Sequence, residues 1–339
     1  MRVFKKISFF LLVSTLILFF SLALRGASRP PKNIMLIGWD GGEFNVVKEG
    51  LKRNRLPNLR KLVAKGTLVN IDIITQPDTK AGWVEILTGY APEVTGVYSN
   101  GDYGPVPEGY TIFERLKEHF GRDKFITAAI ISKKSHLGIS PPLREVVDEK
   151  NETAPENKAI TRLKVIVENG VKYRLIPAEP YYYTQKNMDV FKNGLDANGN
   201  VTTNVLNLLE KYKDKPFFFF VHFGEPDLSG HWYNMSPEKY ELALRGDDSY
   251  TGRIIAKLKE LNLYDSTLIY VVSDHGMTRT PDGSSNHSRH AFLVTNDSKV
   301  IRRGYRVDVA ATILKRFGLD LNKIQPPLEG QPLTEKYTE

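Results

Sequence analysis

Residues 217–223 read FFFFVHF, and this near-continuous apolar run predicts a strand that is buried on both faces of a sheet. Further strand-like runs lie at residues 34–38, 67–74, 125–131 and 267–272. Amphipathic helical patterns separate many of them, at residues 56–64, 111–120, 201–212 and 248–261. Because strands that alternate with helices form sheets covered on both faces, the sequence predicts an α/β fold. Its doubly wound, mostly parallel sheet is expected to carry helices on both faces.

The stretch from about residue 140 to residue 200 interrupts this alternation. It is rich in Pro, Asn, Glu and Tyr and ends in the turn signal DANG at residues 196–199. We interpret it as an insertion that caps a core domain spanning residues 32–339. A plain surface excursion and a lid that shapes the substrate site are equal alternatives for its role.

The N-terminal segment, residues 1–28, is predicted to be a signal-anchor or a signal peptide. Its apolar run at residues 7–24 approaches the hydrocarbon thickness of a bilayer, at about 1.5 Å of helix per residue. The run exceeds the about 7–15 residues usual in a signal peptide, which favours a single uncleaved anchor. With the basic flank inside, the rest of the chain is predicted at the outer face of the cytoplasmic membrane, periplasmic or extracellular. If the segment is cleaved, the protein is secreted.

The formal net charge of +8 is concentrated at the N-terminus. Residues 1–32 hold six basic residues and no acidic one, so the remainder carries only 8 − 6 = +2. A nucleic-acid partner needs a basic patch on the folded domain, and the near-neutral remainder indicates none. The chain has no cysteine, which excludes disulfides and thiolate ligands. Nothing in the sequence indicates an oligomeric state.

Polar side chains follow three of the predicted strands. Asp40 follows the first, Asp227 and His231 follow the phenylalanine-rich one, and Asp274 and His275 follow the last. The carboxyl ends of parallel strands meet at one edge of the sheet, where such folds place their sites. A single aspartate there is usually a cap or turn residue, but three with two histidines favour a metal site. Carboxylate with imidazole suits Zn²⁺, or Mn²⁺ and Mg²⁺ when oxygen dominates.

Thr79 lies where a strand-like segment gives way to a predicted helix. A bound metal can deprotonate a hydroxyl at this place, and the helix N-terminus favours the resulting negative charge. Taken alone, Thr79 would be interpreted as a helix N-cap.

In chain order these motifs resemble the alkaline phosphatase superfamily, most closely its phosphodiesterase/nucleotide-pyrophosphatase and sulfatase-like branches. The matching pieces are GWDG at 38–41, LPNL at 56–59, Thr79 nine residues before TG at 88–89, PDLSGH at 226–231, SDHGM at 273–277 and VDVAATIL at 307–314. The resemblance covers roughly residues 32–335, apart from the insertion.

The resemblance implies two divalent metal ions, Zn²⁺ or alternatively Mn²⁺. The ligands implied for the first ion are Asp40, Thr79, Asp274 and His275. The ligands implied for the second are Asp227, His231 and either His287 or His290. His287 is preferred, because its distance before the strand-like run at 291–294 fits the family pattern better.

The resemblance further implies hydrolysis of a phosphodiester or phosphomonoester through a phospho-threonine intermediate on Thr79. The sulfatase route is disfavoured, because the chain has no Cys and Ala81 stands two residues after the nucleophile. Alternatives are a sulfatase-like or phosphoryl-transferring enzyme using the same site, or a non-catalytic cell-surface binding protein that keeps the fold. The sequence does not name the substrate.

Overall fold

The computed structural model describes residues 31–147 and 163–337. The chain divides into residues 1–31 and a compact unit from Lys32 to Glu339, which holds the fold considered below. In the described part of the chain, no helix is long and apolar enough to cross a membrane. The apolar run at residues 7–24 lies outside the described residues, so the anchor and the signal peptide stay predictions.

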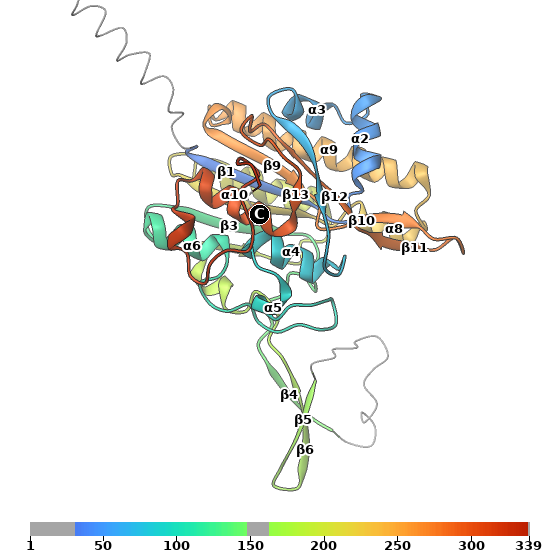
Figure 1. Ribbon diagram of the computed structural model, residues 1–339, viewed down its shortest axis with the longest axis vertical. Helices are drawn as coiled ribbons and strands as arrows, with labels where there is room; N and C mark the ends of the chain where they lie inside the picture. Colours follow the sequence, from blue (N-terminus) through green and yellow to red (C-terminus); the bar gives the residue numbers. More distant parts are fainter. Residues whose placement is uncertain (1–30, 148–162, 338–339) are drawn as a thin grey trace, which may run out of the picture. The chain divides into compact units, whose positions relative to one another are not determined.

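An eight-stranded sheet forms the centre of this unit (Figure 1). Across the sheet the strands are β13 (Gly304–Tyr305), β2 (Thr67–Asp72), β12 (His290–Thr295), β9 (Thr267–Val272), β1 (Asn33–Trp39), β8 (Phe217–Phe223), β3 (Ile126–Ile131) and β7 (Val190–Lys192). Strand β12 runs antiparallel to β2 and β9, and the other neighbouring strands pair in parallel. The predicted α/β fold with a mostly parallel sheet is confirmed.

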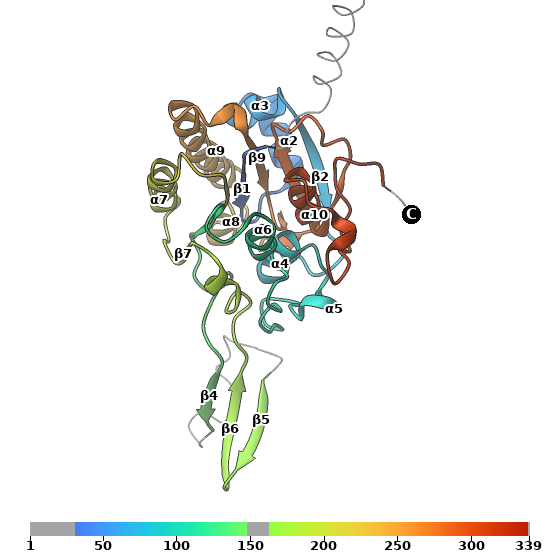
Figure 2. The ribbon, with the colours of Figure 1, turned by 90° about the vertical axis from the view of Figure 1, so that its left-hand side faces the viewer.

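Helices cover both faces of the sheet (Figure 2). One face packs against α4 (Thr79–Thr88), α6 (Ile112–Phe120) and α10 (Arg306–Arg316). The other packs against α2 (Phe44–Lys52), α3 (Pro57–Val63), α7 (Asn198–Lys211) and α9 (Pro237–Glu260). Short elements complete the unit: α5 (Pro92–Thr95) and 3₁₀ turns at Thr184–Asn187, Tyr264–Ser266 and Leu321–Lys323.

The packing of β8 explains why its sequence is apolar at every position except His222. Phe218 and Phe220 enter the core on the α4 face, while Phe217 and Phe219 enter the core on the α9 face. Because side chains alternate along a strand, both alternating sets must be apolar when both faces are buried. The other central strand, β1, is closely covered by α4: a Cβ added at Gly38 would clash with the Trp83 ring.

Helix α9 begins eleven residues before the start predicted from the sequence, at Pro237 rather than residue 248. The buried residues Tyr240 and Leu244 lie on the same side of the helix as Asp248 and Thr251, at helical spacing. Many charged residues around these two apolar positions concealed the pattern.

The predicted insertion contains a three-stranded antiparallel sheet that projects from the body (Figures 1 and 2). It consists of β4 (Leu143–Val146), β6 (Val171–Ile176) and β5 (Lys164–Glu168). The chain then returns to the body, where β7 pairs with β3 at the edge of the main sheet. The projecting part is therefore shorter than the predicted insertion, and its role as a cap stays a prediction.

Candidate active site

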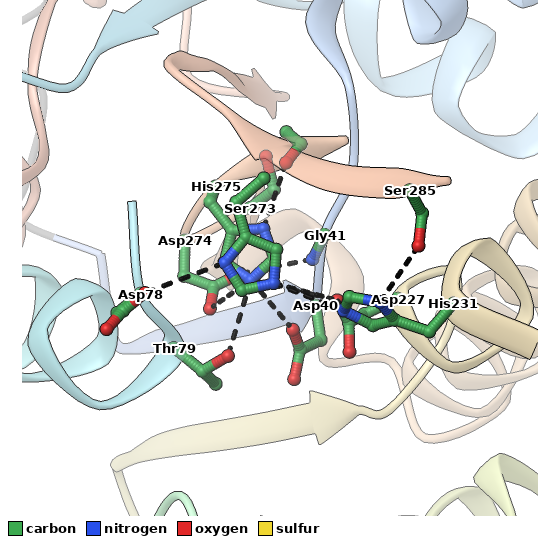
Figure 3. Close-up of polar contacts among 12 residues, drawn as sticks. Asp40, Gly41, Asp78, Thr79, Asp227, His231, Ser273, Asp274, His275 and Ser285 are labelled. Atoms are coloured by element: carbon green, nitrogen blue, oxygen red, sulfur yellow. Dashed lines mark hydrogen bonds and ion pairs between the residues drawn. The ribbon is translucent and has the colours of Figure 1, made fainter. Parts of the chain in front are cut away.

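Three adjacent strands deliver the three aspartates to one edge of the sheet (Figure 3). Asp40 follows β1, Asp274 follows β9 after one residue, and Asp227 opens the short helix α8 (Asp227–Trp232) after β8. Backbone hydrogen bonds tie these ends together: the Asp227 amide donates to the Asp40 carbonyl at 2.9 Å. The Gly41 amide donates to Asp274 Oδ1 at 3.2 Å. All three carboxylates are buried.

Three histidines surround the aspartates, and each directs its Nε2 atom toward them. The Nδ1 atom of each ring contacts a different group. His275 Nδ1 lies 3.0 Å from the Gly276 carbonyl, His231 Nδ1 lies 3.0 Å from Ser285 Oγ, and His287 Nδ1 lies 3.7 Å from Asp78 Oδ1. The Gly276 carbonyl can only accept, so it holds the His275 proton on Nδ1. The Nε2 lone pair is then free to bind a cation. Metal-binding histidines usually have such a hydrogen-bond partner at the other ring nitrogen, which fixes the tautomer.

The inward-facing atoms lie at distances that suit shared ions. His275 Nε2 is 3.3 Å from Thr79 Oγ1, 3.4 Å from Asp40 Oδ1 and 3.6 Å from Asp274 Oδ2. Two ligands of one tetrahedral ion, each about 2.0–2.2 Å from it, lie about 3.3–3.6 Å apart. The buried atoms Asp40 Oδ1, Asp227 Oδ1 and Asp274 Oδ2 accept no hydrogen bond from any described residue.

The donor atoms form two groups, and each group is compact enough to hold one ion. Their members are Asp40, Asp274 and His275 in the first group, and Asp227, His275 and His287 in the second. Since one Nε2 lone pair binds one ion, we assign His275 to the first group. His231 Nε2 takes its place in the second, 3.3 Å from Asp227 Oδ1 and 3.2 Å from His287 Nε2. The residues present therefore fit two divalent cations.

The structure brings His287, and not His290, to this cluster. Strands β10 (Gly276–Arg279) and β11 (Ser285–Ser288) form a hairpin in which His287 pairs with Met277. That register turns His287 toward Asp227, with its Nε2 atom 3.6 Å from Asp227 Oδ1. His290 is exposed at the start of β12.

The pKa values of the aspartates reflect crowded negative charge. Burial raises the pKa of Asp274 to about 7, and the charge of Asp40 adds to this effect. Burial alone would also raise the pKa of Asp40, but Lys133 and His222 hold it well below its usual range. The pKa of Asp227 is lowered to about 2: burial and Asp40 oppose its ionisation, and His231 and Lys133 favour it. Such a cluster attracts cations.

Two residues that touch Asp40 were not predicted as site residues. Lys133, just after β3, lies 3.0 Å from Asp40 Oδ2 through its Nζ atom and also pairs with Asp227 Oδ2. His222 places its Nε2 atom 3.2 Å from Asp40 Oδ2. The only sequence signal for His222 was a polar residue within the FFFFVHF run.

Thr79 is the first residue of α4, and Asp78 is the N-cap. Thr79 is therefore not the N-cap of this helix. The side chain is buried, and its hydroxyl faces His275 Nε2 at the positive end of the helix dipole (Figure 3).

A cavity of about 550 Å³ opens beside Thr79. Its further lining includes Asn100, Lys134, His136 and Glu179. Asn100 Oδ1 accepts a hydrogen bond from the Lys80 amide at 2.9 Å, which leaves the Asn100 Nδ2 group as a donor on the cavity wall. Burial lowers the pKa of His136 to about 4, so this imidazole is neutral at pH 7. The cavity thus offers polar groups next to the candidate nucleophile.

Solved structures share this α/β fold with a mostly parallel sheet. An alkaline phosphatase superfamily protein from Vibrio parahaemolyticus aligns with a TM-score of 0.56 at 16% identity, covering 92% of this chain and 72% of that chain. A lipoteichoic acid synthase from Listeria monocytogenes aligns with a TM-score of 0.57 at 13% identity, covering 91% and 76%. At these identities the likeness concerns the fold.

Residues 34–327 match the model of the type I phosphodiesterase/nucleotide pyrophosphatase family, and the chain belongs to this family. It is 26% identical over 276 residues to a mouse bis(5′-adenosyl)-triphosphatase, covering 81% of this chain and 52% of that protein. Over a shorter stretch of 74 residues it is 39% identical to human ectonucleotide pyrophosphatase/phosphodiesterase family member 1, covering 22% of this chain and 8% of that protein. The chain spans about half the length of the bis(5′-adenosyl)-triphosphatases that it matches.

The raised pKa of Asp274 predicts a pH-dependent stability of the metal-free protein. A carboxyl with a raised folded-state pKa costs stability as the pH rises from its unfolded to its folded pKa, here from about 4 to about 7. Metal-free Asp274→Asn should therefore be more stable than the metal-free parent at pH 8, by on the order of 4 kcal/mol, and equally stable near pH 4. Urea unfolding at both pH values measures this difference.

Saturating Zn²⁺ should reverse the order at pH 8, because the asparagine holds the ion less strongly. Asp265→Asn, which removes a 95% exposed carboxylate, is the control and should match the parent in all conditions. A metal-free Asp274→Asn protein that is less stable than the parent at pH 8 contradicts the charge-crowding account.

Proposed function

We propose that this protein is a metal-dependent hydrolase of phosphate esters with Thr79 as its nucleophile. The position of Thr79 carries the proposal: its hydroxyl lies 3.3 Å from His275 Nε2, at the N-terminus of α4 and on the wall of the cavity. The family match supports a phosphodiester or pyrophosphate-type substrate. Two divalent ions are proposed, Zn²⁺ or Mn²⁺, held by the two donor groups.

Divalent ions bound there would polarise the phosphorus–oxygen bonds of the substrate and lower the pKa of the Thr79 hydroxyl. Every other contribution comes from the chain itself. The α4 N-terminus favours negative charge on Thr79 Oγ1 and on the phosphoryl oxygens near it. Asn100 Nδ2 is placed to donate a hydrogen bond to one of these oxygens.

The reaction is proposed to proceed in two displacements at phosphorus. The Thr79 hydroxyl loses its proton to solvent and its Oγ1 atom attacks phosphorus, the bond from phosphorus to the leaving alcohol breaks, and that alcohol takes up a proton from solvent. Water then loses a proton to solvent and attacks the phosphorus on Thr79, the bond from phosphorus to Oγ1 breaks, and Oγ1 takes up a proton, which restores the hydroxyl. The products are an alcohol and a phosphate or phosphate monoester, and the configuration at phosphorus is retained.

We further propose that this catalytic domain lies at the outer face of the cytoplasmic membrane, held by a single N-terminal anchor. The support is the apolar run at residues 7–24 with its basic flank. Full-length protein should sediment with membranes and be digested by protease added outside spheroplasts. Unprocessed protein in the soluble cytoplasmic fraction contradicts this placement.

Replacing Thr79 tests the nucleophile. Thr79→Ala should lower turnover of a chromogenic phosphodiester by about 10³-fold or more, because no hydroxyl remains to attack phosphorus. Its metal content, measured by elemental analysis, should persist because Asp40, Asp274 and His275 remain. Thr79→Ser should retain part of the rate, and acid quenching of the parent enzyme should trap a phosphorylated peptide containing Thr79.

The matched control is Thr88→Ala, at the other end of the same helix. Thr88 is buried and donates to the Val84 carbonyl at 2.7 Å, away from the cavity. Its loss should lower stability without removing turnover. A Thr79→Ala enzyme that hydrolyses phosphodiesters at the parent rate rules out this mechanism.

A further inference from the structure

Lys133 is the lysine that joins the two donor groups. Its Nζ atom lies 3.0 Å from Asp40 Oδ2, in the first group, and pairs with Asp227 Oδ2, in the second. Its side chain is only 11% exposed. Burial would lower the pKa of Lys133, but Asp40 and Asp227 raise it above its usual value, so the ammonium is charged at pH 7.

The two carboxylates turn their Oδ1 atoms toward His275 and His231 and their Oδ2 atoms toward Lys133, and Asp40 Oδ2 also contacts the buried His222 Nε2 at 3.2 Å. Asp40 Oδ1 faces His275 Nε2 at 3.4 Å, and Asp227 Oδ1 faces His231 Nε2 at 3.3 Å. The Oδ2 atoms of both carboxylates face Lys133 instead. Lys133 therefore contacts the carboxylate oxygens that do not face His275 and His231, which leaves the two Oδ1 atoms to serve as donor atoms for ions.

This arrangement has two electrostatic consequences. In the metal-free protein the ammonium compensates part of the repulsion among Asp40, Asp227 and Asp274. Divalent ions held by the two donor groups would lie near the same ammonium, which would oppose their charge. One residue would therefore stabilise the metal-free site and weaken ion binding.

We propose that Lys133 is a built-in counter-ion that keeps the metal-free site folded and sets its affinity for divalent ions. The inference rests on the two-ion site proposed above and assigns Lys133 a positioning role, not a catalytic one. Lys133 and the neighbouring Lys134 both line the cavity. Lys134 differs in being exposed, and neither donor group pairs with it in the part of the chain that the structure describes.

The test compares Lys133→Gln, Lys133→Arg and the parent as full-length proteins stripped of metal with a chelator. Zn²⁺ affinity is measured by competition with a fluorescent chelator, and thermal midpoints are recorded without and with Zn²⁺. Lys133→Gln should bind Zn²⁺ at least about tenfold more tightly, because a repelling charge is gone. Its thermal midpoint without metal should be lower than that of the parent by about 4 °C or more. The rise in its thermal midpoint on adding Zn²⁺ should exceed the rise seen for the parent.

Lys133→Arg keeps the charge and should match the parent within about threefold in affinity. Lys134→Gln, the charge-matched control, should match it in both measurements. Unchanged or weaker Zn²⁺ binding by Lys133→Gln overturns the inference, as does a Lys133→Gln protein that stays unfolded with Zn²⁺ present. If the parent itself binds no Zn²⁺, the two-ion site is wrong and the inference falls with it.

Discussion

The mutual repulsion of three buried carboxylates is the constraint on which this site depends. Asp40, Asp227 and Asp274 stand at neighbouring strand ends, and each has one oxygen without a hydrogen-bond donor among the described residues. A buried charge in this state is unfavourable unless cations compensate it. Lys133 contributes one positive charge. The inward-facing histidines add ligand atoms to the carboxylates, so that the cluster fits divalent ions. The sheet therefore keeps these charges close together. This arrangement favours metal binding and lowers the stability of the metal-free protein.

The same geometry connects fold to chemistry. Because β1, β8 and β9 are adjacent and parallel, their carboxyl ends meet at one edge. Helix α4 packs over β1 and presents Thr79 at that edge, with its positive end toward the carboxylates. The packing of α4 and the three strands thus brings Thr79 to the edge where the donor groups and the cavity lie.

Much of this arrangement was predictable from the sequence. Strands buried on both faces are apolar at nearly every position, as in FFFFVHF, so they stand out without an alignment. Aspartates and histidines that follow such strands, including Asp40 and Asp274, could then be assigned to the carboxyl edge of the sheet. The start of α9 was missed because charged residues surround Tyr240 and Leu244. The choice of His287 over His290 depends on the register of the β10–β11 hairpin, which sequence alone does not determine. Lys133 was not identified because its partner Asp227 is 94 residues away, and a lysine after a strand is usually solvated.

The most direct measurement of the central claim is X-ray diffraction at the zinc absorption edge, from crystals of the full-length protein grown with Zn²⁺. The account predicts two anomalous peaks about 3.5–4 Å apart. One should lie beside Asp40, Asp274 and His275, and the other beside Asp227, His231 and His287. A single peak in the cluster, or zinc bound elsewhere while the three aspartates hold none, would contradict the account.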